Sequence, residues 1–159
     1  MIFEARKLIL FLAIFAFNFA ACKNKHAPES AANGVAKTSG QEAHIEVQHI
    51  LIGFKGSLPG KTIERTQQEA QKLANEILVK AKAGSDFEAL VKQYTDDRAP
   101  GIYAISNTGI TPEGEEFPRE QMVRAFGDLG FTLKPGEIGI ANFDKERSPF
   151  GFHIIKRLK

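Results

Sequence analysis

The sequence predicts an α+β fold, in which helices pack on a small, mostly antiparallel sheet. Three observations support this class. Apolar, β-branched runs read as strands, two stretches between them have the apolar period of helices, and the strands are too few and too scattered for a doubly wound sheet. The predicted order is strand, helix, helix, a short strand, helix, strand, strand.

The first strand is expected in HIEVQHILIGF, His44 to Phe54. Alternation places one set of side chains on the same face: Ile45, Val47, His49 and Leu51. Ile50 and Ile52 lie on the other face. Because both faces are apolar at its centre, this strand is predicted to be central in the sheet, with both sides covered.

The clearest helix begins at Thr66, which forms a T-x-x-E capping box with Glu69. One apolar stripe follows at helical spacing: Ala70, Leu73, Ala74, Ile77, Leu78 and Ala81. Gly84 is expected to end this helix. A second box, at Ser85 and Glu88, is expected to start a shorter helix that ends before TDDRAPG.

The segment GIYAISNTGITPEGEEFP, residues 101–118, begins with a possible strand pattern and continues as a polar loop. Pro118 is then expected to open a third, short helix. A turn at LKPGEIG leads into a strand over residues 138–143. The last strand is expected from Gly151 to Leu158.

The N-terminus has the pattern of an export signal. Two basic residues precede an almost wholly apolar run, residues 8–21, which is shorter than the roughly 20 residues of a membrane span. The run ends in FAAC, which resembles a bacterial lipobox with phenylalanine where leucine is usual. We predict a signal peptide over residues 1–21 and lipidation of Cys22. An ordinary cleaved signal and an uncleaved anchor are the alternatives.

Residues 22–43 are small and polar, and we expect them to form a flexible tether. Residues 44–159 are predicted to form one domain, which is long enough to bury a core without a metal or a disulfide. A formal net charge of +2 and the lack of an aromatic-basic stripe argue against a nucleic-acid partner. Cys22 is the single cysteine, so no internal disulfide and no cysteine metal site can form.

His49 and His153 are the candidate functional residues that the pattern singles out, since each stands in an apolar run. The first and last strands of such a domain can pair at the sheet centre, so one interpretation is a pair of core histidines that hydrogen-bond each other. A metal site lacks a third nearby ligand. The adjacent carboxylates Asp96 and Asp97 are, by adjacency alone, typical of a solvated loop. No Gly-rich phosphate loop, H-E-x-x-H motif or G-x-S-x-G elbow occurs.

Five blocks occur in the order and spacing of one family: QHILI, GSDFEALVKQYTDD, FPREQMVRAF, FTLKPGEIG and FGFHIIKRL. Together they resemble the parvulin-type peptidyl-prolyl isomerases over nearly all of residues 46–159. The resemblance implies a four-stranded antiparallel sheet surrounded by about four helices. It also implies a peptidyl-prolyl cis-trans isomerase that needs no cofactor and no metal.

The resemblance assigns roles to residues of this chain. His49 and His153 match a hydrogen-bonded pair beneath the active site, and Asp97 falls where the family places a cysteine or an aspartate. These three are the expected catalytic residues. Met122 and Phe126 match the pocket that receives the proline ring, and their spacing of four places both on one face of the third predicted helix.

Further pocket residues follow less directly. Ser148 lies near the family's pocket threonine, and Phe150 and Phe152 are expected in the pocket wall or in the core. The family's GGDLG segment is replaced by residues 101–118, which leaves two candidates for the remaining wall: Ile102 and Ile105. The basic cluster of phosphate-directed members is absent, so we expect no preference for phosphorylated substrates.

The leading interpretation is a monomeric, lipid-anchored isomerase and foldase of the bacterial cell envelope, on the periplasmic side or the cell surface. Its substrates are expected to be Xaa-Pro bonds of unfolded or newly exported polypeptides, and its anchor a lipid on Cys22. A first alternative is a non-catalytic module that holds extended polypeptides. A second is an adhesin or structural lipoprotein that reuses the fold.

Overall fold

The computed structural model describes residues 40–159. The predictions for the signal peptide, for Cys22 and for the tether up to residue 39 lie outside this range. The elements follow in this order: β1 His44–Ile52, α1 Gln67–Lys82, α2 Phe87–Tyr94, β2 Ile102–Ser106, β3 Phe117–Pro118, the 3₁₀ helix η1 Arg119–Gln121, α3 Arg124–Thr132, β4 Ile138–Ala141 and β5 Phe152–Arg157. No helix of the described chain has both the length and the apolar character that crossing a bilayer requires.

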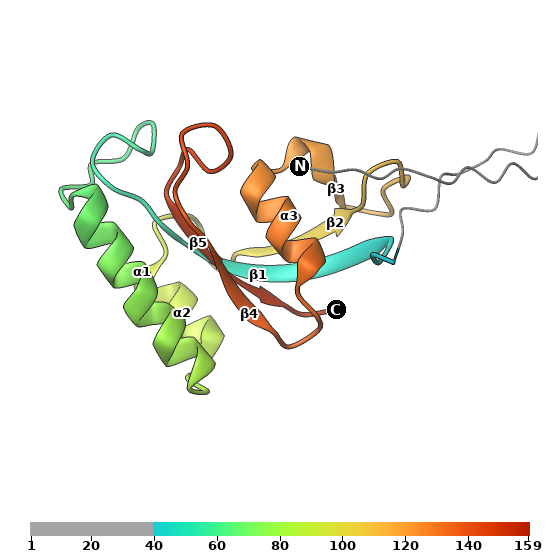
Figure 1. Ribbon diagram of the computed structural model, residues 1–159, viewed down its shortest axis with the longest axis horizontal. Helices are drawn as coiled ribbons and strands as arrows, with labels where there is room; N and C mark the ends of the chain where they lie inside the picture. Colours follow the sequence, from blue (N-terminus) through green and yellow to red (C-terminus); the bar gives the residue numbers. More distant parts are fainter. Residues whose placement is uncertain (1–39) are drawn as a thin grey trace, which may run out of the picture. The chain divides into compact units, whose positions relative to one another are not determined.

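A five-stranded sheet forms the centre of the fold, in the order β3-β2-β1-β5-β4. All neighbouring strands are antiparallel except β2 and β3, which pair in parallel over two residues. Helices α1 and α2 pack on one face and α3 on the other (Figure 1). The predicted α+β class is confirmed. The difference is at the edge, where β3 adds a fifth strand, and in the helices, which number three plus η1 in this part of the chain.

Strand β1 lies in the middle of the sheet because both of its faces are apolar. Ile50 and Ile52 are buried against α1 and α2, whereas Ile45 and Val47 are buried against α3. Strand β5 has the same character and pairs with β1 along its whole length. The prediction of a central strand covered on both sides is confirmed.

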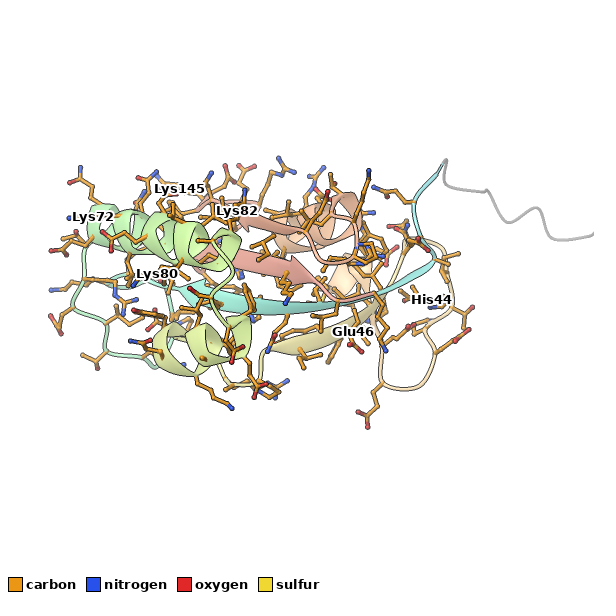
Figure 2. The ribbon with its side chains drawn as sticks, turned by 90° about the horizontal axis from the view of Figure 1, so that it is seen from below. His44, Glu46, Lys72, Lys80, Lys82 and Lys145 are labelled. Atoms are coloured by element: carbon orange, nitrogen blue, oxygen red, sulfur yellow. The ribbon has the colours of Figure 1, made fainter. Side chains whose placement is uncertain are left out.

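Helix α1 begins and ends as its sequence indicates. The Thr66 side chain accepts a hydrogen bond from the Glu69 backbone N–H at 3.2 Å, and the Glu69 carboxylate accepts one from the Thr66 backbone N–H at 2.7 Å. At its C-terminus Gly84 has φ +93° and donates to the carbonyl of Ala81, while Ser85 donates to that of Lys80. This is a Schellman motif. The polar face of α1 carries three exposed lysines, Lys72, Lys80 and Lys82 (Figure 2).

The start of α2 differs from the prediction by one residue. Asp86, and not Ser85, caps this helix, because its Oδ1 atom accepts from the Glu88 backbone N–H at 3.0 Å. Ser85 is already engaged in the C-terminal motif of α1. Two helices separated by so short a link therefore divide the capping residues between them.

The predicted third helix from Pro118 is wrong in one respect that bears on the site. Pro118 precedes the single turn η1, and the Met122 backbone N–H donates to the Arg119 carbonyl at 3.1 Å. The next two residues leave the helical region, with ψ 156° at Met122 and 124° at Val123, and α3 starts only at Arg124. Met122 therefore lies in a break between two helices and not on the helix that carries Phe126.

Candidate active site

A cavity of about 290 Å³ opens over the centre of the sheet, on the face that α3 covers. Side chains from β1, β2, β5, α3, the η1–α3 break and three loops line it: His49, Leu51, Leu58, Asp97, Tyr103, Met122, Val123, Phe126, Phe150 and His153. Six of the residues that the sequence predicts as site or pocket candidates are in this set: His49, Asp97, Met122, Phe126, Phe150 and His153.

The two histidines form the floor of the cavity. His49 on β1 and His153 on β5 are each 3% exposed. Their rings are stacked, with centroids 5.5 Å apart and planes at 15°, and the two Nδ1 atoms are 3.3 Å apart. The antiparallel pairing of β1 with β5 places them side by side, because Leu51 lies opposite His153.

Asp97 connects the histidine floor to the wall of the cavity. Its Oδ2 atom accepts from His49 Nε2 at 3.2 Å and from the Tyr103 hydroxyl at 3.1 Å. The hydrogen bond from His49 is the main reason why the pKa of Asp97 lies well below its usual range, although burial opposes the shift. Asp97 is therefore ionised at neutral pH. Its side chain is 34% exposed, so the charge can face a bound molecule.

The ionised carboxylate fixes the direction of its own hydrogen bonds. Since it can only accept, Nε2 of His49 carries a proton. The two histidine Nδ1 atoms share a further hydrogen bond. Burial, with a smaller effect from the charge of His49, lowers the pKa of His153 to about 3. His153 is thus neutral, and its Nε2 atom has no hydrogen-bond partner among residues 40–159.

An apolar concave surface lies beside these polar groups. Phe126 on α3 is 2% exposed and meets three rings edge-on, those of His49, Tyr103 and His153, at centroid distances of 5.0, 5.9 and 5.6 Å. Met122 completes the wall from the η1–α3 break. Met122 and Phe126 are therefore adjacent in space, as expected. They do not lie on one face of a common helix, because Met122 precedes α3.

Two predicted pocket residues are placed elsewhere. Ser148 is fully buried, and its hydroxyl donates to the Gly151 carbonyl at 3.0 Å within the turn between β4 and β5. Phe152 faces the opposite side of the sheet and packs in the core under α1 and α2. Neither residue lines the cavity, so neither is placed to bind a substrate there, and of the two places expected for Phe152 the core is the one observed. Phe150, their neighbour, does line the cavity.

The remaining wall is Tyr103, which sequence reasoning missed. Ile102 is 47% exposed and Ile105 is buried in the core under α3, so neither candidate borders the cavity. The strand alternation could have indicated Tyr103, because it shares a face of the strand with Ile105. Gly101 sets the approach of β2 to His49, since a Cβ there, at φ +66°, would lie 2.6 Å from the His49 carbonyl oxygen.

The adjacent carboxylates Asp96 and Asp97 are not a solvated pair. Asp96 accepts from the Gly53 backbone N–H at 2.8 Å and forms an ion pair with Arg65. Its backbone carbonyl accepts from Lys61. The two carboxylates therefore have different roles. Asp96 fixes the β1–α1 loop, and Asp97 borders the cavity.

Among residues 40–159 no group of three histidine, cysteine or acidic side chains is arranged to hold a metal ion. The groups that the cavity offers are an apolar concave surface, a carboxylate held by two hydrogen bonds and two imidazoles that hydrogen-bond each other.

This fold and this site define a class of enzyme, the peptidyl-prolyl cis-trans isomerases of the parvulin type. The model of the PPIC-type PPIase domain matches residues 32–159. The chain belongs to this family. Two solved structures share the fold: that of TbPIN1, with a TM-score of 0.56 at 24% identity over 74% of this chain and 98% of the other, and that of the isomerase ESS1 from Candida albicans, with 0.54 at 21% over 74% and 63%.

Curated relatives carry names of folding enzymes. The chain is 37% identical to the foldase protein PrsA 4 of Bacillus cereus, in a match that covers 70% of the present chain. It is 34% identical to the chaperone SurA of Chromohalobacter salexigens, in a match that covers 69% of the present chain. It is 32% identical to the peptidyl-prolyl cis-trans isomerase pin1 of Schizosaccharomyces pombe over 72%. These matches cover 30%, 21% and 59% of the respective relatives, so the chain corresponds to part of each.

Proposed function

We propose that this chain accelerates the cis–trans isomerisation of Xaa-Pro bonds in polypeptides, without forming a covalent intermediate. The observation that carries the proposal is the apolar cup at Phe126 beside an ionised Asp97, which is itself held by His49 and Tyr103. A proline ring is a small apolar group that the cup can hold, and the amide bond before it is the bond whose slow rotation is to be accelerated.

The physics of the reaction sets what the site must do. Rotation about a peptide bond crosses a barrier of about 18–20 kcal/mol that arises from amide resonance. The Xaa-Pro bond is the one with a substantial cis population, and it interconverts slowly. An enzyme accelerates rotation by binding the twisted amide more tightly than either planar form. Each 1.36 kcal/mol of such preference is about a tenfold gain in rate.

The residues divide this work. Phe126 and Met122 hold the ring and exclude water, so that the carbonyl side rotates against a fixed ring. In the twisted amide the nitrogen lone pair localises and the carbonyl oxygen becomes less negative. A carboxylate at Asp97 beside that oxygen disfavours the planar forms and thereby favours the twisted one.

The histidine pair supports the site and transfers no proton in this proposal. His49 holds Asp97 in place through Nε2, and His153 holds His49 through Nδ1. Two buried histidines thus form one polar link across the sheet, under a carboxylate that needs a fixed position. Substituting either histidine is expected to lower stability as well as activity.

The test is a cis–trans exchange measurement by NMR, using the full chain in detergent and Ala-Xaa-Pro-Phe peptides. Exchange above the buffer rate that Asp97→Ala and Phe126→Ala weaken would support an isomerase with this site. Acceleration that survives both substitutions would place the reaction elsewhere. Neither acceleration nor chemical-shift changes on peptide addition would leave the function proposal without support.

A second candidate function is a module that holds extended polypeptides without catalysis. It is favoured by the relative named a chaperone and by residues 101–118, which replace the GGDLG segment of the family. In that case peptides shift the resonances around Met122 and Phe126 without faster exchange. Asp97→Ala would then leave peptide affinity unchanged.

We further propose that the chain works outside the cytoplasm on unfolded or newly exported polypeptides. The support is the signal-like residues 1–21, the lipobox-like FAAC and relatives named foldases. Lipid on Cys22 and a tether over residues 22–43 would hold the 44–159 domain at a membrane. Incorporation of labelled palmitate that Cys22→Ser abolishes would support this, and label retained in the variant would contradict it.

A further inference from the structure

The two edges of the sheet differ in how well they are protected against pairing with another chain. Strand β4 has β5 on one side and no strand on the other (Figure 1). The opposite edge, β3, has only two residues, one of which is Pro118. Proline and charged residues are common devices that keep an edge strand from pairing. The sequence of β4 is IGIA and contains neither, so this edge is open to a further strand.

The pairing of β4 with β5 identifies the backbone groups on the open side. The Arg157 backbone N–H donates to the Glu137 carbonyl at 3.0 Å, which marks these two residues as a hydrogen-bonded pair. Such pairs alternate along an antiparallel ladder, so Gly139 is the next residue that bonds to β5. Ile138 and Ile140 then direct their N–H and C=O groups away from β5. None of these four groups has a hydrogen-bond partner within residues 40–159.

Helices cover both faces of β4 and leave only its edge for a partner. Ile138 and Ile140 pack on the core under α1 and α2. On the other face, a Cβ added at Gly139 would lie 3.1 Å from Leu129 and 3.3 Å from Leu133, at the end of α3. This packing holds the strand extended before anything binds, which lowers the entropy cost of adding a strand.

A second cavity, of about 610 Å³, lies at the edge of the sheet beside the start of β4, and we call it the edge cavity. It shares no lining residue with the cavity over the two histidines. Its lining combines apolar side chains with charges of both signs: Phe87, Leu133, Ile138, Lys82, Lys156 and Glu137. Residues that lie directly opposite each other in a sheet share a face. A side chain opposite Ile138 on an added strand therefore points toward the edge cavity, whose mixed charges favour an apolar group over either sign.

The size of this edge indicates the kind of partner. Stable interfaces between folded proteins bury about 1,200–2,000 Å², and a four-residue strand edge offers much less. An extended polypeptide needs no such area, because backbone hydrogen bonds supply affinity and a pocket for a side chain supplies selectivity. The proposed function, on which this step rests, brings such polypeptides to the chain. We propose that β4 binds an extended segment of an unfolded polypeptide as an added strand, with a large apolar side chain in the edge cavity.

The test is a ¹H–¹⁵N NMR titration of the full chain in detergent. The probes are proline-free peptides, Thr-Val-Xaa-Val-Thr with blocked ends, in which Xaa is phenylalanine, leucine or alanine. We expect the largest shifts and the strongest slowing of hydrogen exchange at the amides of Ile138 and Ile140. The phenylalanine and leucine peptides should bind about threefold or more tighter than the alanine peptide. The same peptides N-methylated at alternate residues cannot pair as a strand and should not bind.

A variant of the edge tests the backbone contact directly. Ile140→Pro removes an outward N–H and keeps the pairing with β5, because that N–H takes no part in it. We expect peptide affinity to fall by about three- to tenfold, the worth of one hydrogen bond. Ile140→Ala is the matched control, since it shortens the same side chain and keeps the N–H. Thermal unfolding checks both variants, and if Ile140→Pro does not fold, the N-methylated peptides on the wild type decide alone.

Three results would overturn the proposal: shifts confined to the cavity over the two histidines, equal binding of the N-methylated peptides, or unchanged affinity in a folded Ile140→Pro. Shifts at Ile138 and Ile140 that appear when the protein alone is concentrated would also overturn it, because they would assign the edge to a second copy of the chain. Exchange of Ala-Xaa-Pro-Phe peptides on the same samples tests the isomerase separately. Binding at β4 without faster exchange would reject the isomerase and keep the edge site, and faster exchange without binding at β4 would do the reverse.

Discussion

At the scale of single residues, Tyr103 gives the cleanest test of the hydrogen bonds around Asp97. Tyr103→Phe removes one hydroxyl and keeps the ring. The pKa of Asp97 is lowered mainly by His49 and less by Tyr103, so it should rise in the variant and remain below its usual range. We expect kcat/KM to fall by about three- to tenfold, the worth of one hydrogen bond.

A ¹³C NMR titration of the Asp97 carboxyl, with exchange rates measured on the same sample, checks both expectations. Lys92 and Glu88, an exposed ion pair on α2, supply the control, because Glu88→Gln should change neither quantity. An unchanged Asp97 titration in Tyr103→Phe would contradict the hydrogen bond.

His153 predicts a pH dependence of stability. Burial lowers its pKa from 6.5 to about 3 in the folded chain. Between these values the unfolded chain takes up the proton and the folded chain does not, so stability falls as the pH drops from about 6.5 to about 3. The slope from this group approaches about 1.4 kcal/mol per pH unit.

Urea denaturation of the wild type and of His153→Phe at several pH values measures this. The difference between the two free energies of unfolding should change across the window and be constant above it. The contribution of His44, whose pKa is raised by the hydrogen bond that it donates to Glu116, is present in both proteins and cancels. Parallel pH profiles of the two proteins would show that His153 is not held neutral.

Single residues also show how much of the candidate site can be predicted from the sequence. His49 and His153 stand out because a titratable ring in an apolar run is uncommon, and strand pairing then brings them together. Phe152 lies in the core and not in the cavity wall, because alternate residues of a strand face opposite sides and the neighbours of His153 along the chain point away from it. Tyr103 was missed because it lies in a segment that departs from the family pattern.

At the scale of elements, Asp128 links the segments that carry the cavity walls. Its carboxylate pairs with Arg119 of η1 at 2.7 Å and with Arg147 of the β4–β5 turn at 2.9 Å. The Ala125 backbone N–H donates to the Arg147 carbonyl at 2.8 Å and ties the same turn to α3. The break with Met122 and the turn with Phe150 are thus held against one helix.

Asp128→Asn should loosen this arrangement with little loss of stability, because the carboxylate is 39% exposed and such ion pairs contribute at most about 1 kcal/mol. We expect peptide KM to rise by about three- to tenfold, with kcat changed less. Kinetics and thermal unfolding together separate this from a general loss of fold. A KM equal to that of the wild type would mean that the walls keep their positions without the ion pairs.

The break between η1 and α3 shows why helix boundaries resist prediction here. A spacing of four between Met122 and Phe126 is the signature of one helix face, and proline before it is a common helix start. Two extended residues interrupt the run, and no proline or glycine in the sequence marks the interruption. Tertiary bonds of Arg119 and Asp128 fix the break, and these are not visible in local sequence.

At the scale of the whole molecule, the two faces of the sheet have separate tasks. The face under α1 and α2 is a closed apolar core, and the face under α3 holds the cavity. The sequence predicts the central strands well, because their burial on both faces leaves long apolar runs. It predicts the edge poorly, because β3 has only two residues and pairs through the backbone.

Arg157 connects β5 of the sheet to the C-terminal end of α3, which allows a prediction about overall stability. It is 2% exposed at the end of β5, and its guanidinium donates to the carbonyls of Gly130 and Leu133 at 3.1 Å and to that of Lys159. The first two belong to the C-terminal turn of α3, where carbonyls lack partners and favour a cation. Arg157 therefore anchors the helix that forms the cup to the sheet that forms its floor.

Arg157→Met keeps an apolar stem and removes the donors to the carbonyls of Gly130 and Leu133, whereas the Lys159 carbonyl still accepts from the Glu46 backbone N–H at 3.0 Å. We expect the free energy of unfolding to fall by about 2–4 kcal/mol in urea denaturation. Lys145→Met is the control, since Lys145 is exposed in the β4–β5 turn (Figure 2) and should cost little. Because Arg157 lies outside the cavity, any acceleration of Xaa-Pro exchange should persist wherever the variant is folded. A variant as stable as the wild type would show that α3 is held by its apolar face alone.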